Sequence, residues 1–402
     1  MPFGAFLAFC AVVLLAASAP VQATIVIFGH HQGLSGQSIA RPGAEVPVYS
    51  VRLVNDGNST LQSIALTLSD LSTPTGIGAS AFAQLRLYRS ADATFDAGSD
   101  SLLGTQNSVA LGSPSTISLD APLNWNSSFP YFIATLTLST THVDEVGTNK
   151  DAFRVGSAAG AIATSSGAIG GEIVADNANS VSIDVVATQV AFATQPVDAT
   201  ASNGDVVSGR AFATQPVLEA RDAYGNVDVD ASGSASISVG SGSVSLSGST
   251  GVNWTAGRAP FTNLAVTTAS DAASFTLSAT SSGLTSATSR SLVADIVATQ
   301  MVFTAQPTHG GVANGDVLSG VPFQTQPVVS AQDADGRVDT DFNDAITLTT
   351  SAPGTLSGTT TRSASSGVAT FTDIAYTATV DQQSFALLAD DLPGGSEIGR
   401  AH

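Results

Sequence analysis

Aspartates gathered in short segments are the residues of this chain whose type and spacing could do chemistry. Asp228 and Asp230 stand two residues apart, and so do Asp339 and Asp341. Calcium takes six to eight oxygen ligands, and closely spaced carboxylates commonly supply them. Each pair is therefore a candidate calcium site.

These segments are not EF-hands. An EF-hand needs a bidentate glutamate at its twelfth position, and Val239 and Thr350 stand there. Asp222 and Asp333 lie a few residues upstream and are further candidate ligands. The alternative is structural, because aspartates also form turns by accepting hydrogen bonds from nearby backbone amides. Asp222 and Asp333 would then cap turns, and the other aspartates would be solvated loop charges.

A third acidic group, Asp92, Asp96 and Asp100, recurs at intervals of four residues near the start of the chain. The same two interpretations apply to it, weak calcium binding or turn formation. Calcium is the one cofactor that the sequence suggests.

Other residue types offer less chemistry. The sequence contains no His-Glu-x-x-His zinc motif, no Gly-x-Ser-x-Gly nucleophile elbow and no dinucleotide fingerprint after a strand. We therefore predict that the chain is not an enzyme and has no catalytic residues. Trp125 and Trp254 either stack on sugar rings, as in many carbohydrate-binding sandwiches, or pack in a core.

Charge limits the class of partner. The chain has 402 residues, with 13 Lys and Arg against 32 Asp and Glu, for a net charge of −19. Sequence-independent nucleic-acid binding needs cationic groups that displace phosphate counterions, so nucleic acids and anionic lipid surfaces are not expected partners. Lys150 is the single lysine, which argues against a phosphate-cradling loop or Schiff-base chemistry.

The segment 1–23 is typical of a cleaved signal peptide. It is apolar and ends in Val21-Gln22-Ala23, with small residues where signal peptidase requires them. A membrane anchor is the alternative, although the apolar run is short for a span of about 20 residues. Cys10, the only cysteine, lies within this segment. The mature chain would then have no disulfide and no membrane span, and we expect it to be secreted.

The rest of the chain carries a repeat with a period near 110. Ala187-Thr188-Gln189, Gln195-Pro196 and Asn203-Gly204-Asp205 each recur at an offset of 111, and Phe261-Thr262 recurs at an offset of 110. We define repeat 1 as residues 188–298 and repeat 2 as residues 299–402. Residues 24–187 form a different, longer domain.

Alternation of apolar residues with Ser and Thr predicts half-buried β-strands throughout. About seven short strands in each repeat, separated by Gly, Asn and Asp, indicate a β-sandwich. We predict an all-β fold of tandem immunoglobulin-like sandwiches in an elongated array, with very little helix. Runs in the first domain are expected as strands at residues 46–54, 61–68, 84–88 and 131–138.

The junctions and the end of repeat 2 raise two further expectations. Matching runs at 185–192 and 296–303, with no Gly/Pro/Ser-rich linker, suggest that the last strand of one domain leads almost directly into the first of the next, as in a semi-rigid rod. The closing strand of repeat 1 is expected at 292–296, and its counterpart would fall at 402–406. The sequence is thus expected to be a fragment of a longer array, or its last domain lacks an edge strand.

Both repeats also share a signature of longer motifs in one order, which includes 217–226 and 257–264 in repeat 1 and 331–336 and 367–372 in repeat 2. Across both repeats, 188–402, this signature resembles the bacterial immunoglobulin-like repeats of invasin- and intimin-type surface proteins. Residues 88–100 are similar to a segment common in cell-adhesion-related bacterial domains.

The resemblance implies an extracellular or surface-displayed stalk or adhesin, with an unidentified protein or glycan ligand. Because such sandwiches host many functions, the family does not define the ligand. Our leading hypothesis is a non-enzymatic structural or adhesion protein, stiffened at its Asp-rich loops by calcium. The alternatives are a carbohydrate- or ligand-binding module and a spacer region of a larger secreted hydrolase.

Overall fold

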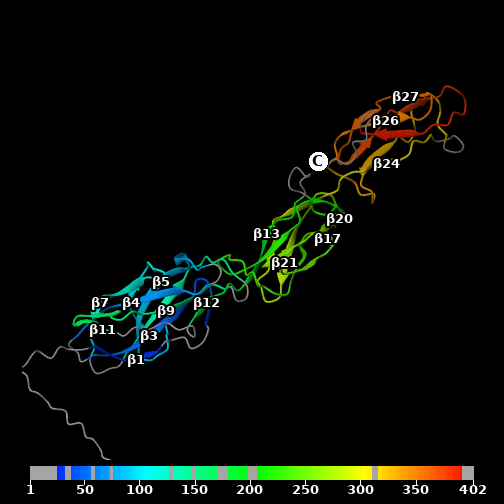
Figure 1. Cartoon of the computed structure of the whole chain (residues 1–402). Helices are drawn as coiled ribbons and strands as arrows, with labels where there is room; N and C mark the ends of the chain where they lie inside the picture. Colours follow the sequence, from blue (N-terminus) through cyan, green and yellow to red (C-terminus); the bar gives the residue numbers. More distant parts are fainter. Residues whose placement is uncertain are drawn as a thin grey trace, which may run out of the picture. The chain divides into compact units, whose positions relative to one another are not determined.

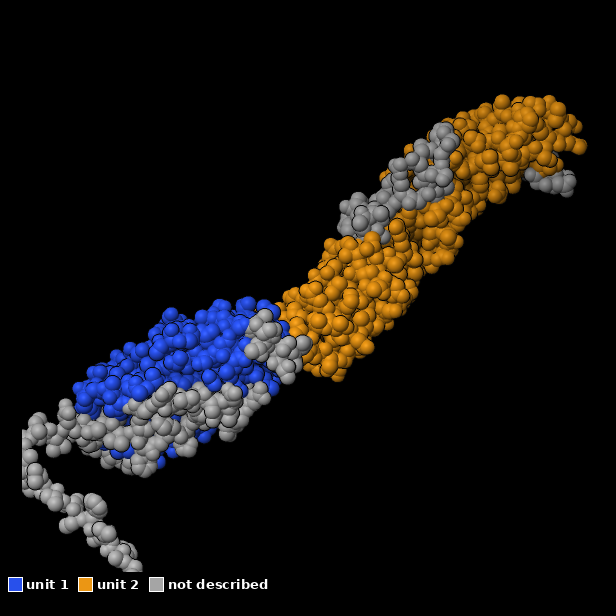
Figure 2. Space-filling model, viewed as in Figure 1, with its two compact units in different colours: residues 1–184 blue, residues 185–402 orange. Residues whose placement is uncertain are grey.

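The computed structural model divides the chain into two compact units, Met1–Asp184 (unit 1) and Val185–His402 (unit 2) (Figures 1 and 2). It describes residues 25–31, 38–55, 59–72, 76–125, 130–145, 150–169, 180–197, 206–309 and 316–391. The predicted signal peptide, with Cys10, lies outside these ranges. A search of them for helices that could cross a membrane finds none.

The described residues are nearly all β, with a single 3-10 turn, η1 (Ala79–Ala81). Alternation in the sequence becomes alternation of burial: along β4 (Leu61–Asp70) every second side chain from Ile64 to Leu68 is fully buried. This follows from the strand geometry, in which successive side chains point to opposite faces. The predicted fold class, tandem immunoglobulin-like sandwiches with very little helix, is confirmed.

The described residues of unit 1 form two sheets that pack around a hydrophobic core, which includes Leu53, Leu66 and Phe132. One sheet has the order β1-β3-β8-β5-β6, and the other has the order β11-β10-β4-β9-β12-β2, with β7 paired to β4. The remaining strands are β1 (Ile25–His31), β2 (Ser38–Ala40), β3 (Glu45–Asn55), β5 (Phe82–Ser90), β6 (Ser101–Gln106), β7 (Pro114–Leu123), β8 (Tyr131–Leu138), β9 (Ala152–Gly156), β10 (Ile162–Thr164), β11 (Gly167–Ile169) and β12 (Val181–Ile183). All four predicted runs of this domain are strands.

Repeat 1 has its own core, which includes Leu218, Phe275 and Leu277. Its sheets have the orders β13-β15-β19, β14-β23-β21-β16-β18 and β17-β20, and β22 also pairs with β21. Its strands are β13 (Gln189–Thr194), β14 (Val206–Val207), β15 (Val217–Arg221), β16 (Ser234–Ser241), β17 (Val244–Ser247), β18 (Gly251–Asn253), β19 (Arg258–Pro260), β20 (Ala265–Thr268), β21 (Ala273–Ser281), β22 (Ala287–Thr288) and β23 (Leu292–Asp295). The predicted closing strand is β23.

Repeat 2 has a separate core that includes Val329, Phe371 and Tyr376. The described sheets have the orders β24-β25-β29, β28-β26-β31 and β27-β30. Its described strands are β24 (Gln300–Ala305), β25 (Val328–Gln332), β26 (Ala345–Thr350), β27 (Thr355–Ser357), β28 (Thr361–Ser363), β29 (Val368–Thr370), β30 (Ala375–Thr377) and β31 (Leu387–Asp390). The repeats match in detail, since a β-bulge after Phe192 in β13 recurs after Phe303 in β24.

The connections at the junctions are short, as expected. β12 ends at Ile183 and β13 begins at Gln189, while β23 ends at Asp295 and β24 begins at Gln300, so the runs at 185–192 and 296–303 are strands only in their second halves. Residues 184–188 and 296–299 have no strand assignment. The physical reason is that the amides of Ala187 and Ala298 donate to aspartate side chains and not to a neighbouring strand.

One glycine shows how tightly the Asp-containing loop is packed. Gly257 has a φ of +71°, and a Cβ there would lie 2.5 Å from the carbonyl oxygen of Asp228. Gly225 also has a positive φ, +93°, but a Cβ there would meet no heavy atom within 4 Å. Both positions favour glycine because of their positive φ. At Gly257, but not at Gly225, a neighbouring backbone atom also leaves no room for a Cβ.

We therefore expect Gly257→Ala to destabilise repeat 1 more than the matched control Gly225→Ala. The control should cost about 1 kcal/mol of unfolding free energy through backbone strain, and Gly257→Ala about 1–3 kcal/mol more, since the loop must also shift. Urea denaturation followed by Trp254 fluorescence in a Trp125→Phe background measures both. Equal losses in the two variants would mean that the loop is not closely packed on Gly257.

Candidate metal centre

Asp222 and Asp333 close the same turn in the two repeats. The backbone amides two and four residues on donate to Asp222 Oδ1, both at 2.9 Å. The corresponding amides donate to Asp333 Oδ1 at 3.0 and 2.8 Å. These are the contacts of an aspartate-capped turn. Within the described part of the chain, neither residue belongs to a group of three acidic or histidine side chains close enough to share an ion.

Asp228 and Asp339 hold the segment that leads into each repeat. Asp228 Oδ2 accepts a hydrogen bond from Ala187 N at 2.8 Å, and Asp339 Oδ2 accepts one from Ala298 N at 2.8 Å. Both carboxylates are buried, with residue exposures of 6% and 2%. We call the segments 184–188 and 296–299 the linkers. Asp228 and Asp339, both predicted metal ligands, therefore accept hydrogen bonds from the linker backbone, and the contact recurs at an offset of 111 residues.

Asp341 lies close to two aspartates of repeat 1. Carboxylate oxygens of Asp271, Asp295 and Asp341 are all within 4.8 Å of one another. Asp271 lies between β20 and β21, Asp295 ends β23, and Asp341 lies between β25 and β26. We call these three residues the junction cluster. Its carboxylate oxygens are the donors that a hard cation such as calcium prefers.

Asp271 also connects the two repeats directly. Its Oδ1 accepts the amide of Ile296 at 2.7 Å, in the linker. Its Oδ2 accepts both the amide and the hydroxyl of Thr340 in repeat 2, at 2.8 and 2.7 Å. Hydrogen bonds to a charged acceptor are shorter and stronger than neutral ones. One carboxylate thus ties repeat 1 to the linker and to the Asp-rich loop of repeat 2.

The electrostatics of the loop follow from burial and crowding. Burial raises the pKa of Asp339 to about 7, and the hydrogen bond and charge of Asp341 act in the same direction, against the lowering effect of the amides of Ala298 and Phe342. A carboxyl in this position keeps its proton to near neutral pH unless a cation stabilises the ionised form.

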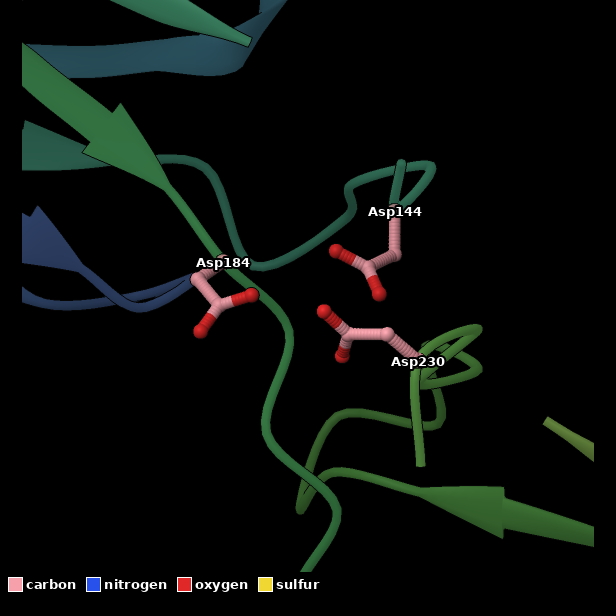
Figure 3. Close-up of side chains that lie close together, drawn as sticks. All are labelled: Asp144, Asp184 and Asp230. Carbon is pink, nitrogen blue, oxygen red and sulfur yellow. The ribbon is translucent and has the colours of Figure 1, made fainter. Parts of the chain in front are cut away.

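Unit 1 contains an acidic pair of its own. Carboxylate oxygens of Asp144 and Asp184 lie within 4.8 Å of one another (Figure 3). Lys150, the single lysine, donates to Asp184 Oδ1, so a cation is already present at this pair. Asp230, the third side chain drawn in Figure 3, belongs to unit 2 and lies between β15 and β16, at the position of Asp341.

Asp92, Asp96 and Asp100 form the loop between β5 and β6. Asp96 Oδ1 accepts the amide of Gly98 at 2.8 Å, and Asp100 Oδ2 accepts the amide of Asp96 at 2.9 Å. Asp92 Oδ1 accepts the amide two residues on at 2.8 Å. Hydrogen bonds from the Gly98 amide and from Ser99 lower the pKa of Asp96. The three aspartates thus accept hydrogen bonds from backbone amides of the same loop, as in aspartate-capped turns.

Both tryptophans are buried. Trp125 is 5% exposed and packs on Phe132, with ring centroids 5.1 Å apart, and Trp254 is 8% exposed and donates from Nε1 to Ser281 Oγ at 3.1 Å. An indole that stacks on a sugar must present a face to solvent, so neither ring is such a platform. Packing in a core, the other interpretation of these residues, accounts for both.

Two members of the junction cluster were not among the predicted ligands, Asp271 and Asp295. A signal for Asp295 exists, because Asp184 and Asp295 both stand three residues before the repeated Ala-Thr-Gln, at an offset of 111. Asp271 is distant from Asp341 in the sequence, and no local pattern marks it. Only the folded arrangement of the repeats brings it to the cluster.

Comparison with known proteins gives fold neighbours only. No protein-family model matches the chain, and neither does any curated protein. The solved structures that are similar include the extracellular cadherin domains 1–4 of protocadherin gamma B7 (9% identity, 85% of this chain and 66% of that one, TM-score 0.28). They also include the BSP domain of a biofilm-associated protein (10% identity, 87% and 65%, TM-score 0.20) and extracellular domains 3–5 of Drosophila OTK (11% identity, 93% and 96%, TM-score 0.19).

The chain thus spans about two thirds of the length of the first two of these structures. The fold class rests on the sheets described above, since the TM-scores are all below 0.5. The similarity to invasin- and intimin-type repeats remains a prediction from the sequence.

The raised pKa of Asp339 predicts that repeat 2 loses stability as the pH rises. The folded state holds this proton up to about pH 7, whereas the unfolded chain releases it near pH 4, so the folded state binds more protons in between. We expect the free energy of unfolding to fall by on the order of 1–3 kcal/mol from pH 4 to 7 and then to level off. Urea titrations in EDTA across this range measure it.

Asp341→Asn provides the comparison, because it removes the neighbouring charge with little change in volume. The fall in stability between pH 4 and 7 should be smaller in this variant. The same fall in both proteins would show that Asp341 does not contribute to the raised pKa.

Proposed function

We propose that this chain is a non-enzymatic structural segment of an extracellular or bacterial surface protein, in which successive sandwiches act as a stalk or adhesive array. Its domains in this proposal are residues 24–187, 188–298 and 299–402, after a signal peptide at 1–23. The observation that carries the proposal is the set of hydrogen bonds that Asp271 accepts from the linker at Ile296 and from Thr340 of repeat 2. A stalk must transmit force between domains, and a shared charged acceptor couples them.

The linker contacts support the same function. The amides of Ala187 and Ala298 donate to buried aspartates. The next amide in each linker donates to a strand carbonyl, from Thr188 to Arg221 and from Thr299 to Gln332, both at 2.8 Å. Between repeats 1 and 2, a linker fixed at successive amides has little freedom to swivel.

Calcium is the proposed stiffening ion, and the junction cluster is its proposed site. The donor set fits a hard cation, because three carboxylates offer six oxygens. Both oxygens of Asp271 also accept hydrogen bonds. Bound calcium would offset the repulsion among the three charges and draw linker and loop together. The buried Asp339 beside the cluster would ionise more readily near such a charge.

This proposal predicts that calcium stabilises the mature chain. Binding to the native state alone adds RT ln(1 + [L]/Kd), about 1.4 kcal/mol at a calcium concentration ten times Kd. We expect the melting temperature to rise by a few degrees when millimolar calcium replaces EDTA. Asp341→Ala should abolish the rise, because Asp341 is exposed and its loss leaves the linker hydrogen bonds in place.

Asp120→Ala, at an exposed position in unit 1, is the matched control and should keep the full rise. A rise that persists in Asp341→Ala would place calcium elsewhere in the chain. The absence of any rise in the unaltered protein would exclude the stiffening ion and leave the coupling by Asp271 to be tested alone.

The coupling itself can be tested without calcium. The mature chain would lack cysteine, so nitroxide labels at Ser238→Cys and Thr349→Cys, both exposed, would report one distance between repeats 1 and 2. In EDTA we expect a narrow distance distribution in the parent and a broader one in Asp271→Ala. Equally narrow distributions would show that Asp271 does not restrain the repeats.

A further inference from the structure

Lys150, the single lysine, stands opposite Asp184 at the end of a strand pair in unit 1. β9 and β12 pair antiparallel, with Ser182 opposite Ala152. The last amide of β12 donates to the carbonyl of Asp151 at 2.7 Å, so the register continues beyond these partners. Lys150 and Asp184 come next on each side and are therefore directly opposite. Side chains in such a pair start only about 5 Å apart at Cβ and lie on the same face of the sheet.

The amine of Lys150 contacts the carboxyl group of Asp184. Lys150 Nζ donates to Asp184 Oδ1, and the two side chains are only 18% and 14% exposed. The backbone of Asp184 is also held from its other side, since its amide donates to the carbonyl of Ala40 at 2.9 Å. The sheet thus keeps an amine and a carboxyl group in contact and largely away from solvent.

A second carboxyl group, that of Asp144, lies beside this pair. Carboxylate oxygens of Asp144 and Asp184 are within 4.8 Å of one another, and Figure 3 shows both groups facing the same space. Asp144 follows β8 and is 6% exposed. A buried ion pair retains the cost of removing two charges from water. Transfer of one proton from the ammonium to a carboxylate removes both charges and leaves a neutral amine and a neutral acid.

The use of lysine at this one position is informative. Of the 13 basic residues in the chain, 12 are arginine. An arginine would form the better ion pair, because its planar guanidinium binds a carboxylate through two parallel hydrogen bonds. A guanidinium does not lose its proton in proteins, whereas a lysine amine becomes a nucleophile once it is deprotonated. The single side-chain amine of this protein thus contacts a carboxyl carbon that it could attack.

We propose that Lys150 and Asp184 form an intramolecular amide bond, with Asp144 as the proton relay. The Lys150 ammonium gives a proton to a carboxylate, and the neutral Nζ attacks Cγ of Asp184. A C–N bond forms, one C–O bond breaks, and the oxygen leaves as water. The two protons that leave the nitrogen both end on this oxygen, passed on by Asp144. One ammonium and one carboxylate become one amide and one water, so atoms and charge balance without another reactant.

Positioning supplies the driving force that this reaction lacks between free molecules in water. Groups held in a productive geometry react with effective concentrations on the order of 10⁵–10⁸ M. An acid–base group placed at the reacting atoms contributes a further factor of about 10²–10⁴. The reaction modifies the chain once and turns over no substrate, so it does not make this protein an enzyme.

The bond would lie where the chain leaves unit 1. Asp184 is the first residue of the linker 184–188, and Lys150 stands two residues before β9. β9 in turn pairs with β4 in the same sheet. Tension applied through the linker would then reach β9 through a covalent bond and not through the hydrogen bonds of β12 alone. The inference goes beyond the proposed function, because the bond requires neither calcium nor a role as a stalk.

The test is the intact mass of the purified mature chain. We expect this mass to be lower than that of the sequence by one water molecule. Lys150→Arg, which keeps the ion pair, and Asp184→Ala should both have the full mass of their sequences. Trypsin should release one branched peptide that joins 90–154 to 155–210, because it does not cut after a cross-linked lysine. Asp120→Ala, at an exposed position in unit 1, is the matched control and should lose the water.

Asp144→Asn tests the proton relay, because it keeps the shape of the side chain and removes its acid–base function. We expect amide formation to be about 100-fold slower in this variant, so that most of the purified protein has its full mass and loses water only over time.

The full sequence mass in the unaltered protein would overturn the proposal and leave Lys150 and Asp184 as an ion pair. So would a loss of water that persists in Lys150→Arg, or one that maps to a succinimide at another aspartate. Complete loss of water in freshly purified Asp144→Asn would overturn the role of Asp144.

Discussion

The structure of unit 2 depends on a hydrogen bond from a linker amide to a buried aspartate at the start of each repeat. Ala187 donates to Asp228 and Ala298 donates to Asp339, at the same distance and from loops with the same position in the two repeats. A buried carboxylate is costly unless it is hydrogen-bonded. Movement of the linker would leave a buried carboxylate without its hydrogen bond, which would cost free energy. This hydrogen bond therefore fixes the residues just before the first strand of each repeat.

The loop that contains Asp339 also brings negative charges together. Asp341 lies two residues after Asp339 in this loop, and Asp271 and Asp295 of repeat 1 lie close to Asp341. Crowded carboxylates can be accommodated by retaining a proton or by binding a cation. The raised pKa of Asp339 is the first response, and calcium at the junction cluster is the proposed second one. In unit 1, Lys150 meets the same need at Asp184 by direct pairing.

The two repeats also differ in a way that shared sequence motifs conceal. Repeat 1 buries its apolar edge under β22 and β23, whereas the equivalent edge of repeat 2 is a groove among the described residues. Phe385 and Leu387, which line this groove, are therefore only half-buried, whereas Phe275 and Leu277 of repeat 1 are fully buried.

Much of this protein can be predicted from the sequence, because the decisive signals are local. Alternation of apolar and small polar residues predicted strands such as β4 and β8, the repeat period predicted the matching of β13 with β24, and the spacing around Asp222 and Asp333 is that of their turns. Strand formation and turn capping are set by neighbours within a few residues.

Tertiary structure alone decided which aspartates meet. Asp271 accepts hydrogen bonds from Thr340 across a long stretch of intervening sequence, and Asp341, the next residue, lies near Asp271 and Asp295. Burial of Trp125 and Trp254 was likewise decided by packing between sheets. A sequence specifies which residues can accept hydrogen bonds or fill a core, but which charges become neighbours depends on how distant loops are placed, and that is a property of the folded chain.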